Sequence, residues 1–389
     1  MIQILHHVAS LAPQSGGPAR SITALADSLA AKEGYSVTLL SQTLYNGVII
    51  TATPNSQVDR QLAYSHSKLA LKIGWPLKHL LDTVIPKARP VLLHDHGLWT
   101  PSNYYIASAA RRFQIPLVIH PHGMLEPWAL KYRGYKKRWA LRLYQRRNLE
   151  TAVLLFATAE QEAENIRKFG LHQPIAIIPN GIELALSRPN KVLDEQTRSS
   201  SRIALFLGRI HPIKGLLNLV EAWGRIRPAH WHLCLAGPDE GGYLAVVMRR
   251  IRELNLEATI EYVGEVEGDT KAALLTHAEL FILPTFSENF GIVVAEALSY
   301  GLPVITTHGA PWEELMTRGC GWWIEPTVEA LTLTLREALN MTPSHLQAMG
   351  NRGFSYAQEF NWTHIAQQTI EVYRWILGQG PMPACVLRN

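Results

Sequence analysis

Short apolar runs alternate with helical patterns along this chain, and that alternation is the strongest constraint on its fold. Residues 2–8 read IQILHHV, a Gly-Gly-Pro turn follows, and residues 19–32 have a helical pattern before the next run, YSVTLLS. Further runs of the same kind are PVLLH, PLVIH and AVLLFAT. Near-continuous apolar strands separated by helices indicate a parallel sheet covered on both faces. The sequence therefore predicts a doubly wound α/β fold.

A polar stretch divides the chain into two parts. Residues 184–201, LALSRPNKVLDEQTRSSS, lose the periodicity and have the composition of a linker. The alternation restarts with RIALFLG, HWHLCLAG, ATIEYVG, AELFILP, LPVITT and GWWIEP. Because 389 residues exceed one ordinary core, two domains are expected. We place them at residues 1–185 and 186–361, followed by a packing helix over residues 362–377.

Composition narrows the class of protein. The chain is 47% hydrophobic and 18% charged, as soluble globular proteins are. No apolar run approaches the roughly 18 residues that span a bilayer, and MIQILHHVAS lacks the charged start of a signal peptide. We therefore expect a cytoplasmic protein. The three cysteines, Cys234, Cys320 and Cys385, are far apart, which indicates neither a disulfide framework nor a zinc site.

The positive charge is concentrated in one segment. Residues Lys131 to Arg147 contain eight Lys or Arg residues and no acid, with Trp139 and Leu143 one helical turn apart. Such a segment is typical of a helix resting on an anionic membrane surface or of a solvated helix. We favour the membrane. Nucleic acid is a weaker interpretation, because no groove-binding motif accompanies the patch.

Ligands of open α/β sheets bind beyond the carboxyl ends of the strands, so we expect the functional residues in the loops that follow the strands. In SGGPAR, after the first strand, Gly16 and Gly17 allow the backbone to approach a phosphate or a sugar. A plain tight turn is an equal alternative. The loop is not GxGxxG and the second strand ends in Ser-Gln, which argues against a dehydrogenase.

A second loop, LGRIHPIKG, places Arg209 and Lys214 five residues apart around a strand-to-helix turn. Two cations near a helix N-terminus suit a diphosphate, the Arg by its fork geometry and the Lys as a point charge. A solvated pair is the alternative.

A third loop, SENFGIVVAE, contains two carboxylates. Glu288 is expected at the mouth of the site and Glu296 inside the following helix, about 8 to 10 Å away. That separation suits two ends of one ligand, such as the transferred sugar and the ribose of a nucleotide sugar. The amides of Phe290, Gly291 and Ile292 would face the phosphates between them. The alternative, a capping Glu288 and a surface-paired Glu296, explains Glu296 poorly because its helical neighbours are mostly apolar.

Two similar sequences, HDHG at residues 94–97 and HPHG at residues 120–123, close apolar runs. Neither has the spacing of a helical metal site, so we expect the two loops to line the ligand site opposite Glu288, with an imidazole bound to a sugar hydroxyl or phosphate. The chain has no DxD motif for a divalent cation. Arg209, Lys214 and the helix dipole would take the place of that metal.

Several of these segments together resemble the retaining GT-B glycosyltransferases of family 4, which include many exopolysaccharide and lipopolysaccharide glycosyltransferases. The segments are SGGPARSITALADSLA, IIPNGIE, FLGRIHPIKGLLNLVEAW, LAGP and PTFSENFGIVVAEALSYGLPVITT. PHGMLEPWALKY further resembles the subgroup that extends bacterial surface polysaccharides. The resemblance implies two Rossmann-like domains facing across a cleft, with residues 362–389 crossing back to the first domain.

The resemblance also implies residue roles. Glu288 would bind the transferred sugar and Glu296 the ribose, while Arg209 and Lys214 would hold the diphosphate and stabilise its charge as it leaves. His122 would meet the sugar and the acceptor. The remaining donor-binding residues would be Gly17, Gly208, Val263, Asn289, Phe290, Gly291 and Ile292.

The expected activity is transfer of a hexosyl group, with glucose favoured, from a UDP-sugar to a hydroxyl of a saccharide or a lipid-diphosphate-linked acceptor. No carboxylate of the first domain is placed as a nucleophile, so we expect a same-face, metal-independent reaction with retention. GDP-mannose is the alternative donor. A sugar-nucleotide epimerase, which needs an acid/base pair but no acceptor, and a non-catalytic binding subunit are the rival functions.

Overall fold

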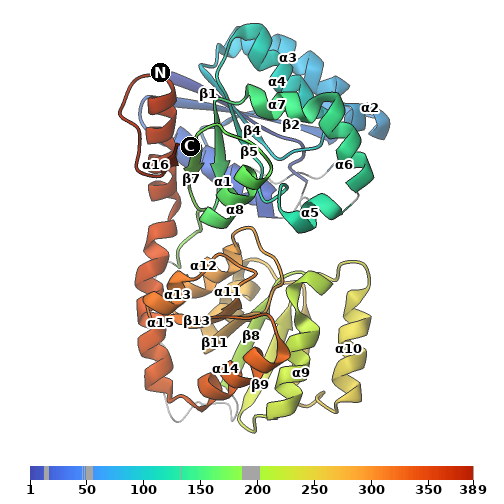
Figure 1. Cartoon of the computed structure of the whole chain (residues 1–389), viewed down its shortest axis with the longest axis vertical. Helices are drawn as coiled ribbons and strands as arrows, with labels where there is room; N and C mark the ends of the chain where they lie inside the picture. Colours follow the sequence, from blue (N-terminus) through green and yellow to red (C-terminus); the bar gives the residue numbers. More distant parts are fainter. Residues whose placement is uncertain are drawn as a thin grey trace. The chain divides into compact units, whose positions relative to one another are not determined.

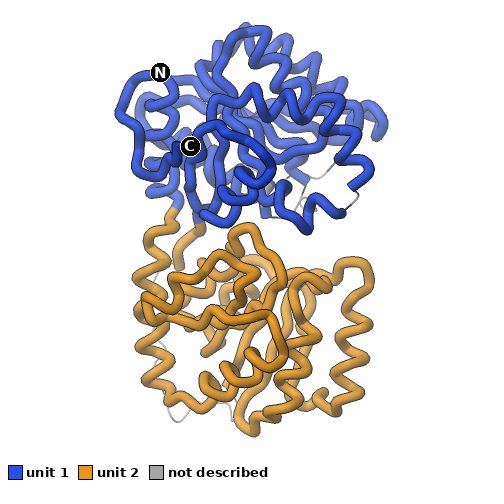
Figure 2. The backbone as a smooth tube through the Cα atoms, in the orientation of Figure 1, with its two compact units in different colours: residues 1–181, 362–389 blue, residues 182–361 orange. Residues whose placement is uncertain are grey.

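The computed structural model describes residues 1–12, 17–45, 47, 49, 56–132, 134–185 and 202–388. It divides into two compact units, unit 1 with residues 1–181 and 362–389, and unit 2 with residues 182–361 (Figure 2). The division at residue 181 falls four residues before the end of the expected first domain. Gly16, Arg133 and the linker residues 186–201 lie outside the described residues.

Unit 1 is built on an eight-stranded sheet of order β14-β7-β6-β5-β4-β1-β2-β3 (Figure 1). Its strands are parallel except β14, which pairs antiparallel to β7. The order reverses at β1, which lies between β2 and β4, so the sheet is doubly wound. The strands are β1 (Ile2–Val8), β2 (Tyr35–Leu44), β3 (Asp59–Ser65), β4 (Leu92–His96), β5 (Leu117–His120), β6 (Leu154–Ala157), β7 (Ile175–Ile177) and β14 (Val386–Leu387).

Two cores cover the two faces of this sheet, because successive residues of a strand point to opposite sides. Leu5 belongs to the core that contains α3 and α4, and Ile4 to the core that contains α1 and α16. Helix α16 therefore packs on unit 1 although it follows unit 2 in the sequence. The helices are α1 (Gly17–Ala30), α2 (Lys68–Ile73), α3 (Trp75–Ala88), α4 (Pro101–Phe113), α5 (Pro127–Lys131), α6 (Gly134–Ala140), η2 (Leu141–Gln145), α7 (Arg146–Thr151), α8 (Glu160–Lys168) and α16 (Trp362–Ile376).

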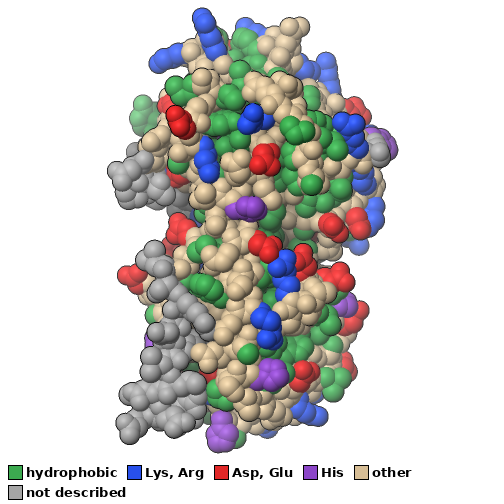
Figure 3. Space-filling model, turned by 90° about the vertical axis from the view of Figure 1, so that its left-hand side faces the viewer, with side chains coloured by type: hydrophobic (Ala, Val, Ile, Leu, Met, Phe, Trp, Pro, Cys, Tyr) green, Lys and Arg blue, Asp and Glu red, His purple; other side chains and the backbone are tan. Residues whose placement is uncertain are grey.

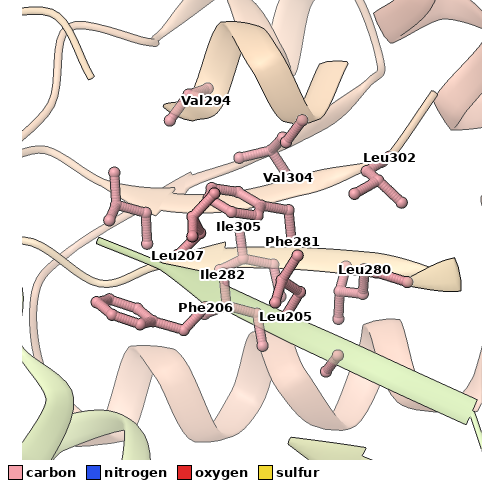
Figure 4. Packing of buried hydrophobic residues seen from close by; sticks show 14 of the residues in the cluster. Leu205, Phe206, Leu207, Leu280, Phe281, Ile282, Val294, Leu302, Val304 and Ile305 are labelled. Atoms are coloured by element: carbon pink, nitrogen blue, oxygen red, sulfur yellow. The ribbon is translucent and has the colours of Figure 1, made fainter. Parts of the chain in front are cut away.

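Unit 2 is built on a six-stranded parallel sheet of order β10-β9-β8-β11-β12-β13. The strands are β8 (Arg202–Leu207), β9 (Trp231–Ala236), β10 (Ile260–Gly264), β11 (Leu280–Leu283), β12 (Val304–Thr307) and β13 (Gly321–Ile324). The central strands are buried on both faces, as Leu205, Phe281 and Ile305 show in Figure 4. The predicted α/β class with two Rossmann-like domains is confirmed in both units.

The helices of unit 2 are η3 (Pro212–Lys214), α9 (Leu216–Ile226), α10 (Tyr243–Glu253), α11 (Gly268–His277), α12 (Ile292–Ser299), α13 (Glu314–Thr317), α14 (Val328–Asn340), α15 (Pro343–Ala357) and η4 (Gln358–Phe360). Within the described ranges, no helix is long and apolar enough to cross a membrane. On the face of unit 2 seen in Figure 3, acidic and basic side chains are interspersed.

Candidate functional site

The turn between β8 and α9 carries Arg209 and Lys214. His211 begins η3 by accepting a hydrogen bond at Nδ1 from the amide two residues on, at 3.2 Å. Gly215 ends η3 with φ 69°, and a Cβ atom there would lie 1.9 Å from the carbonyl oxygen of Pro284. Glycine is therefore needed at this position for both its conformation and its size. The close approach fixes the β8 turn against the carboxyl end of β11.

Lys214 and Glu288 are brought together by that approach. The Lys214 ammonium donates a hydrogen bond to the Glu288 carboxylate, and the two side chains are only 9% and 20% exposed. Arg209 instead lies at the surface and pairs with Glu240, which follows β9. The two cations expected at a diphosphate are thus placed differently, Lys214 inside the turn and Arg209 at its rim.

The loop before α12 is held by hydrogen bonds to the next strand-end loop. The amide of Glu288 donates to the carbonyl of Gly309 at 2.7 Å, and Nε1 of the buried Trp312 donates to the carbonyl of Phe290 at 2.5 Å. No hydrogen bond among the described residues uses the amides of Gly291 and Ile292. These amides begin a helix, where the backbone favours an anion.

Glu296 lies in α12 with its side chain 22% exposed. Its Oε1 accepts a hydrogen bond from Lys271 of α11 at 2.6 Å. Its Oε2 is buried and has no hydrogen-bond partner among the described residues. A buried carboxylate oxygen without a donor is unfavourable, so a ligand hydroxyl at this position would be stabilising. The ion pair exists, as one alternative expected, but it satisfies only one of the two oxygens.

The ends of β8, β9 and β10 complete this edge of unit 2. The amide of Gly208 donates to the carbonyl of Ala236 at 3.0 Å, and a Cβ on Gly237 would lie 2.0 Å from the Gly208 carbonyl oxygen. Val263, near the end of the edge strand β10, is 37% exposed. Gly208 and Val263 therefore lie at the same edge of the sheet as Lys214 and Glu288, because parallel strands end together.

Unit 1 places the predicted histidines differently from the expectation. His94 and His96 lie in β4 and His120 ends β5, and all three side chains are buried. They face α16 rather than line a loop, because alternation along β4 and β5 directs them into the core that contains Ile365 and Tyr373. His122 alone lies beyond the strand and is partly exposed, with φ 52°.

The turn that carries His122 is held by hydrogen bonds to a buried carboxylate of α8. Glu162 of α8 accepts a hydrogen bond at Oε1 from the amide of Gly123 at 2.5 Å. Its other oxygen accepts from the amide and the hydroxyl of Thr158, at 2.8 and 2.9 Å. The position of His122 is therefore set by a filled hydrogen-bond network. Gly17, the expected partner from the first loop, begins α1.

Both halves of the chain match families of known proteins. Residues 16–181 match the family described as "Glycosyl transferase 4-like domain", and residues 188–356 match "Glycosyl transferases group 1". The chain belongs to the glycosyltransferases that these two family models describe. The two matches agree with the two units and leave only short segments of the chain uncovered.

Two known proteins illustrate the range of similar sequences. The alpha-maltose-1-phosphate synthase of Mycolicibacterium smegmatis is 27% identical, over 73% of this chain and 78% of its own length. The GDP-mannose:cellobiosyl-diphosphopolyprenol alpha-mannosyltransferase of Xanthomonas campestris is 24% identical, over 74% of both proteins.

Solved structures share the GT-B fold. A sucrose-phosphate synthase from Thermosynechococcus elongatus has a TM-score of 0.78 at 21% identity, covering 97% of this chain and 100% of its own. Anabaena HepE, in complex with UDP-glucose, has a TM-score of 0.71 at 18% identity, covering 96% and 100%. At these identities the structures establish the fold alone.

Several residues that contact the predicted site residues carry no signal in the sequence. Lys271, Glu240 and Trp312 contact Glu296, Arg209 and the Phe290 carbonyl from elements distant in the sequence. A Lys in a helix and a Glu in a loop carry no distinguishing pattern, so only the tertiary structure reveals them. Asn289, Phe290 and Gly291 lie between β11 and α12, and Ile292 is the first residue of α12.

Some histidines are close enough together to hold a metal ion. Two groups place one ring nitrogen of each member within 4.8 Å of the others: His6, His94 and His96, and His96, His120 and His122. Both nitrogens of His96 already hydrogen-bond to neighbouring histidines, at 2.9 and 3.0 Å. A metal ion bound by His96 would have to replace one of these bonds. The expectation of metal-independent transfer stays a prediction.

Proposed function

We propose that the chain transfers a hexosyl group from a UDP-sugar, UDP-glucose being the first to test, to a hydroxyl of a saccharide or lipid-linked acceptor in polysaccharide synthesis, with retention and without a divalent metal. The observation that carries this proposal is the unpartnered Oε2 of Glu296, buried in the helix that begins beside the Lys214–Glu288 pair. A ribose hydroxyl would donate to that oxygen.

The donor would replace two ion pairs with several contacts. The diphosphate would take Lys214 and Arg209 from their present partners, Glu288 and Glu240. Glu288 would then accept hydrogen bonds from the transferred sugar, while the α12 amides and Gly208 lie against the phosphates. Lys214 would stabilise the charge that develops on the leaving diphosphate, whose oxygen takes the acceptor's proton on the same face of the sugar.

The nucleotide base of the donor is proposed from similar proteins, and these proteins differ in the nucleotide named for them. The Anabaena structure contains UDP-glucose, which supports UDP, whereas the Xanthomonas relative is named for GDP-mannose. Val263, at the expected base position, is exposed and has an aliphatic side chain. It can contact the face of a base but cannot form a hydrogen bond that distinguishes uracil from guanine. GDP-mannose therefore remains the second donor to test.

A membrane partner is proposed for the basic segment of unit 1. The exposed large side chains of α5, α6, η2 and the residue after α5 are Trp128, Tyr132, Tyr135, Trp139 and Leu143. Aromatic and cationic side chains side by side suit the interface of an anionic bilayer. The proposal predicts that the protein sediments with phosphatidylglycerol vesicles, less so as a Trp139→Ser variant, and does not sediment with phosphatidylcholine vesicles. Equal binding of wild type and variant to phosphatidylglycerol would contradict it.

The test of the proposed function is a transfer assay with radiolabelled UDP-glucose and, separately, GDP-mannose, using bacterial lipid extract as acceptor and EDTA throughout. Label should enter the lipid fraction with wild-type protein and not with Glu288→Gln. NMR of the product should show the anomeric configuration of the donor. Release of free or epimerised sugar without acceptor would indicate the epimerase, and donor binding with no turnover on any acceptor would indicate a binding subunit.

A further inference from the structure

A continuous line of hydrogen bonds runs through the interior of unit 1 and ends at His122. His122 Nε2 lies 3.0 Å from Nδ1 of His96, and Nε2 of His96 lies 2.9 Å from Nδ1 of His6. Nε2 of His6 lies 3.4 Å from the hydroxyl of Tyr373, which lies 2.6 Å from Nδ1 of His94. The line thus joins β1, β4 and the turn after β5 to the C-terminal helix α16.

The imidazoles in this line are neutral. Burial lowers the pKa of His6 and of His122 to about 3. Burial, and then the neighbouring histidines, lower the pKa of His94 and His96 well below the usual value. A neutral imidazole has one ring nitrogen that donates and one that accepts.

In a line of hydrogen-bonded neutral imidazoles, the tautomer of each ring depends on the tautomers of its neighbours. His96 and His6 each use both ring nitrogens within the line, so a donor at one nitrogen requires an acceptor at the other. Only two patterns satisfy every bond and also use the hydroxyl hydrogen of Tyr373, and the direction in which that hydroxyl points decides between them. In one pattern His122 carries its proton on Nε2, and in the other on Nδ1.

The distances favour the first pattern. A hydroxyl donates most strongly at short range, and Tyr373 is much closer to His94 than to His6. If the hydroxyl donates to His94, its oxygen accepts from Nε2–H of His6, and each following Nε2–H donates to the next Nδ1. His122 then keeps its proton on Nε2 and has a lone pair on Nδ1, for which no described residue is a partner.

We propose that Tyr373, acting through His6 and His96, fixes the tautomer of His122 so that its Nδ1 accepts a hydrogen bond from a hydroxyl of the sugar or acceptor. Tyr373, His6 and His96 are thus positioning residues for a reaction that takes place at His122. The proposal rests on the proposed function, which supplies a sugar and an acceptor that carry hydroxyls, and on the expectation from the family resemblance that His122 meets them. Without the line, both tautomers of His122 would be populated, and some of the molecules would present an N–H at Nδ1 instead of a lone pair.

The test reads the tautomers directly by NMR of the full-length protein with 15N-labelled histidine. In the wild type, the signals of His6, His94, His96 and His122 should be those of the Nε2–H form, and variants with single His→Asn substitutions assign them. Tyr373→Phe, which keeps the ring in the core, should move His122 towards a mixture of tautomers. Tyr144→Phe, whose hydroxyl donates to the carbonyl of Trp99 at 2.8 Å, should change none of these signals.

Kinetics provide the second readout. Tyr373→Phe should lower kcat roughly tenfold, equivalent to about 1.4 kcal/mol, with KM for the donor unchanged. An Nδ1–H signal for His122 in the wild type, or an unchanged tautomer in Tyr373→Phe, would overturn the proposal even if the wild type transfers sugar normally. Tautomers that respond to Tyr373→Phe in a protein that transfers no sugar would instead show that the line exists and that the proposed function is wrong.

Discussion

At the scale of single residues, Lys214 and Glu288 neutralise each other in the absence of a ligand. Both side chains are largely buried, so each would be costly to keep charged without the other. Their pairing holds a cation and a carboxylate in a desolvated turn. Under the proposed function, a diphosphate would compete for the lysine, and the pair would supply two binding groups for the donor.

Lys214→Met should accordingly destabilise unit 2 by about 1 to 3 kcal/mol, because Glu288 is left without its donor. Adding Glu288→Gln to that variant should restore part of the loss, since no uncompensated charge remains. Thermal unfolding measures both effects. Neither variant should transfer sugar, and an active Lys214→Met enzyme would contradict the role assigned to the lysine.

At the scale of elements, two close approaches of the backbone shape the site. The β8 turn touches the end of β11 at Gly215, and the end of β9 touches the β8 turn at Gly237. Each contact leaves no room for a Cβ atom. The residues that we expect to bind the donor in unit 2 are thus positioned by packed strand ends, which bring residues far apart in the sequence close enough to form ion pairs.

Gly215→Ala should lose both stability and nucleotide affinity, because its Cβ would force the β8 turn away from Pro284. Gly241→Ala is the matched control, since Gly241 also has positive φ but nothing within 4 Å of the added atom. The control should lose about 1 to 2 kcal/mol from backbone strain alone and keep its affinity for UDP. Equal affinities for UDP in the two variants would show that the close approach is irrelevant to binding.

The sequence predicted the helices and strands better than it predicted the side-chain contacts between them. Apolar runs such as FILP and VITT predicted buried parallel strands because their pattern depends on local residues alone. The loop with Glu288 was located because it follows FILP, and the loop with Lys214 because it follows the apolar run RIALFLG. The histidines of β4 were misjudged as loop residues, because polar side chains inside a strand make sense only once His6 and Tyr373 are seen beside them.

At the scale of the whole molecule, the histidines of unit 1 couple stability to pH. Burial lowers the pKa of His6, His94, His96, His120 and His122 in the folded state. In the unfolded chain these residues titrate near the ordinary value of 6.5. Below that value the unfolded state binds more protons, so stability falls as pH falls.

The thermal midpoint of unit 1 should therefore decrease between about pH 7.5 and about pH 5.5, a range in which carboxylates stay ionised. Each buried histidine contributes up to about 1.4 kcal/mol per pH unit below its unfolded pKa. Calorimetry of wild type and His120→Phe measures the effect, and the variant should have the shallower dependence because it lacks one of these groups. A midpoint independent of pH would contradict this account, because it would mean that the histidines bind protons equally in the folded and the unfolded state.

The measurement that tests the central claim most directly is a thermal-shift titration with UDP, GDP, ADP and NAD, in EDTA, on wild type and Glu296→Ala. A nucleotide at 100 times its dissociation constant should stabilise the protein by about 2.7 kcal/mol. We predict that UDP raises the midpoint of the wild type and not of Glu296→Ala, while Glu329→Ala, a change at an exposed ion pair of α14, responds as the wild type does. A shift with NAD alone, or an equal shift in Glu296→Ala, would contradict the assignment of Glu296 to the ribose of a sugar nucleotide.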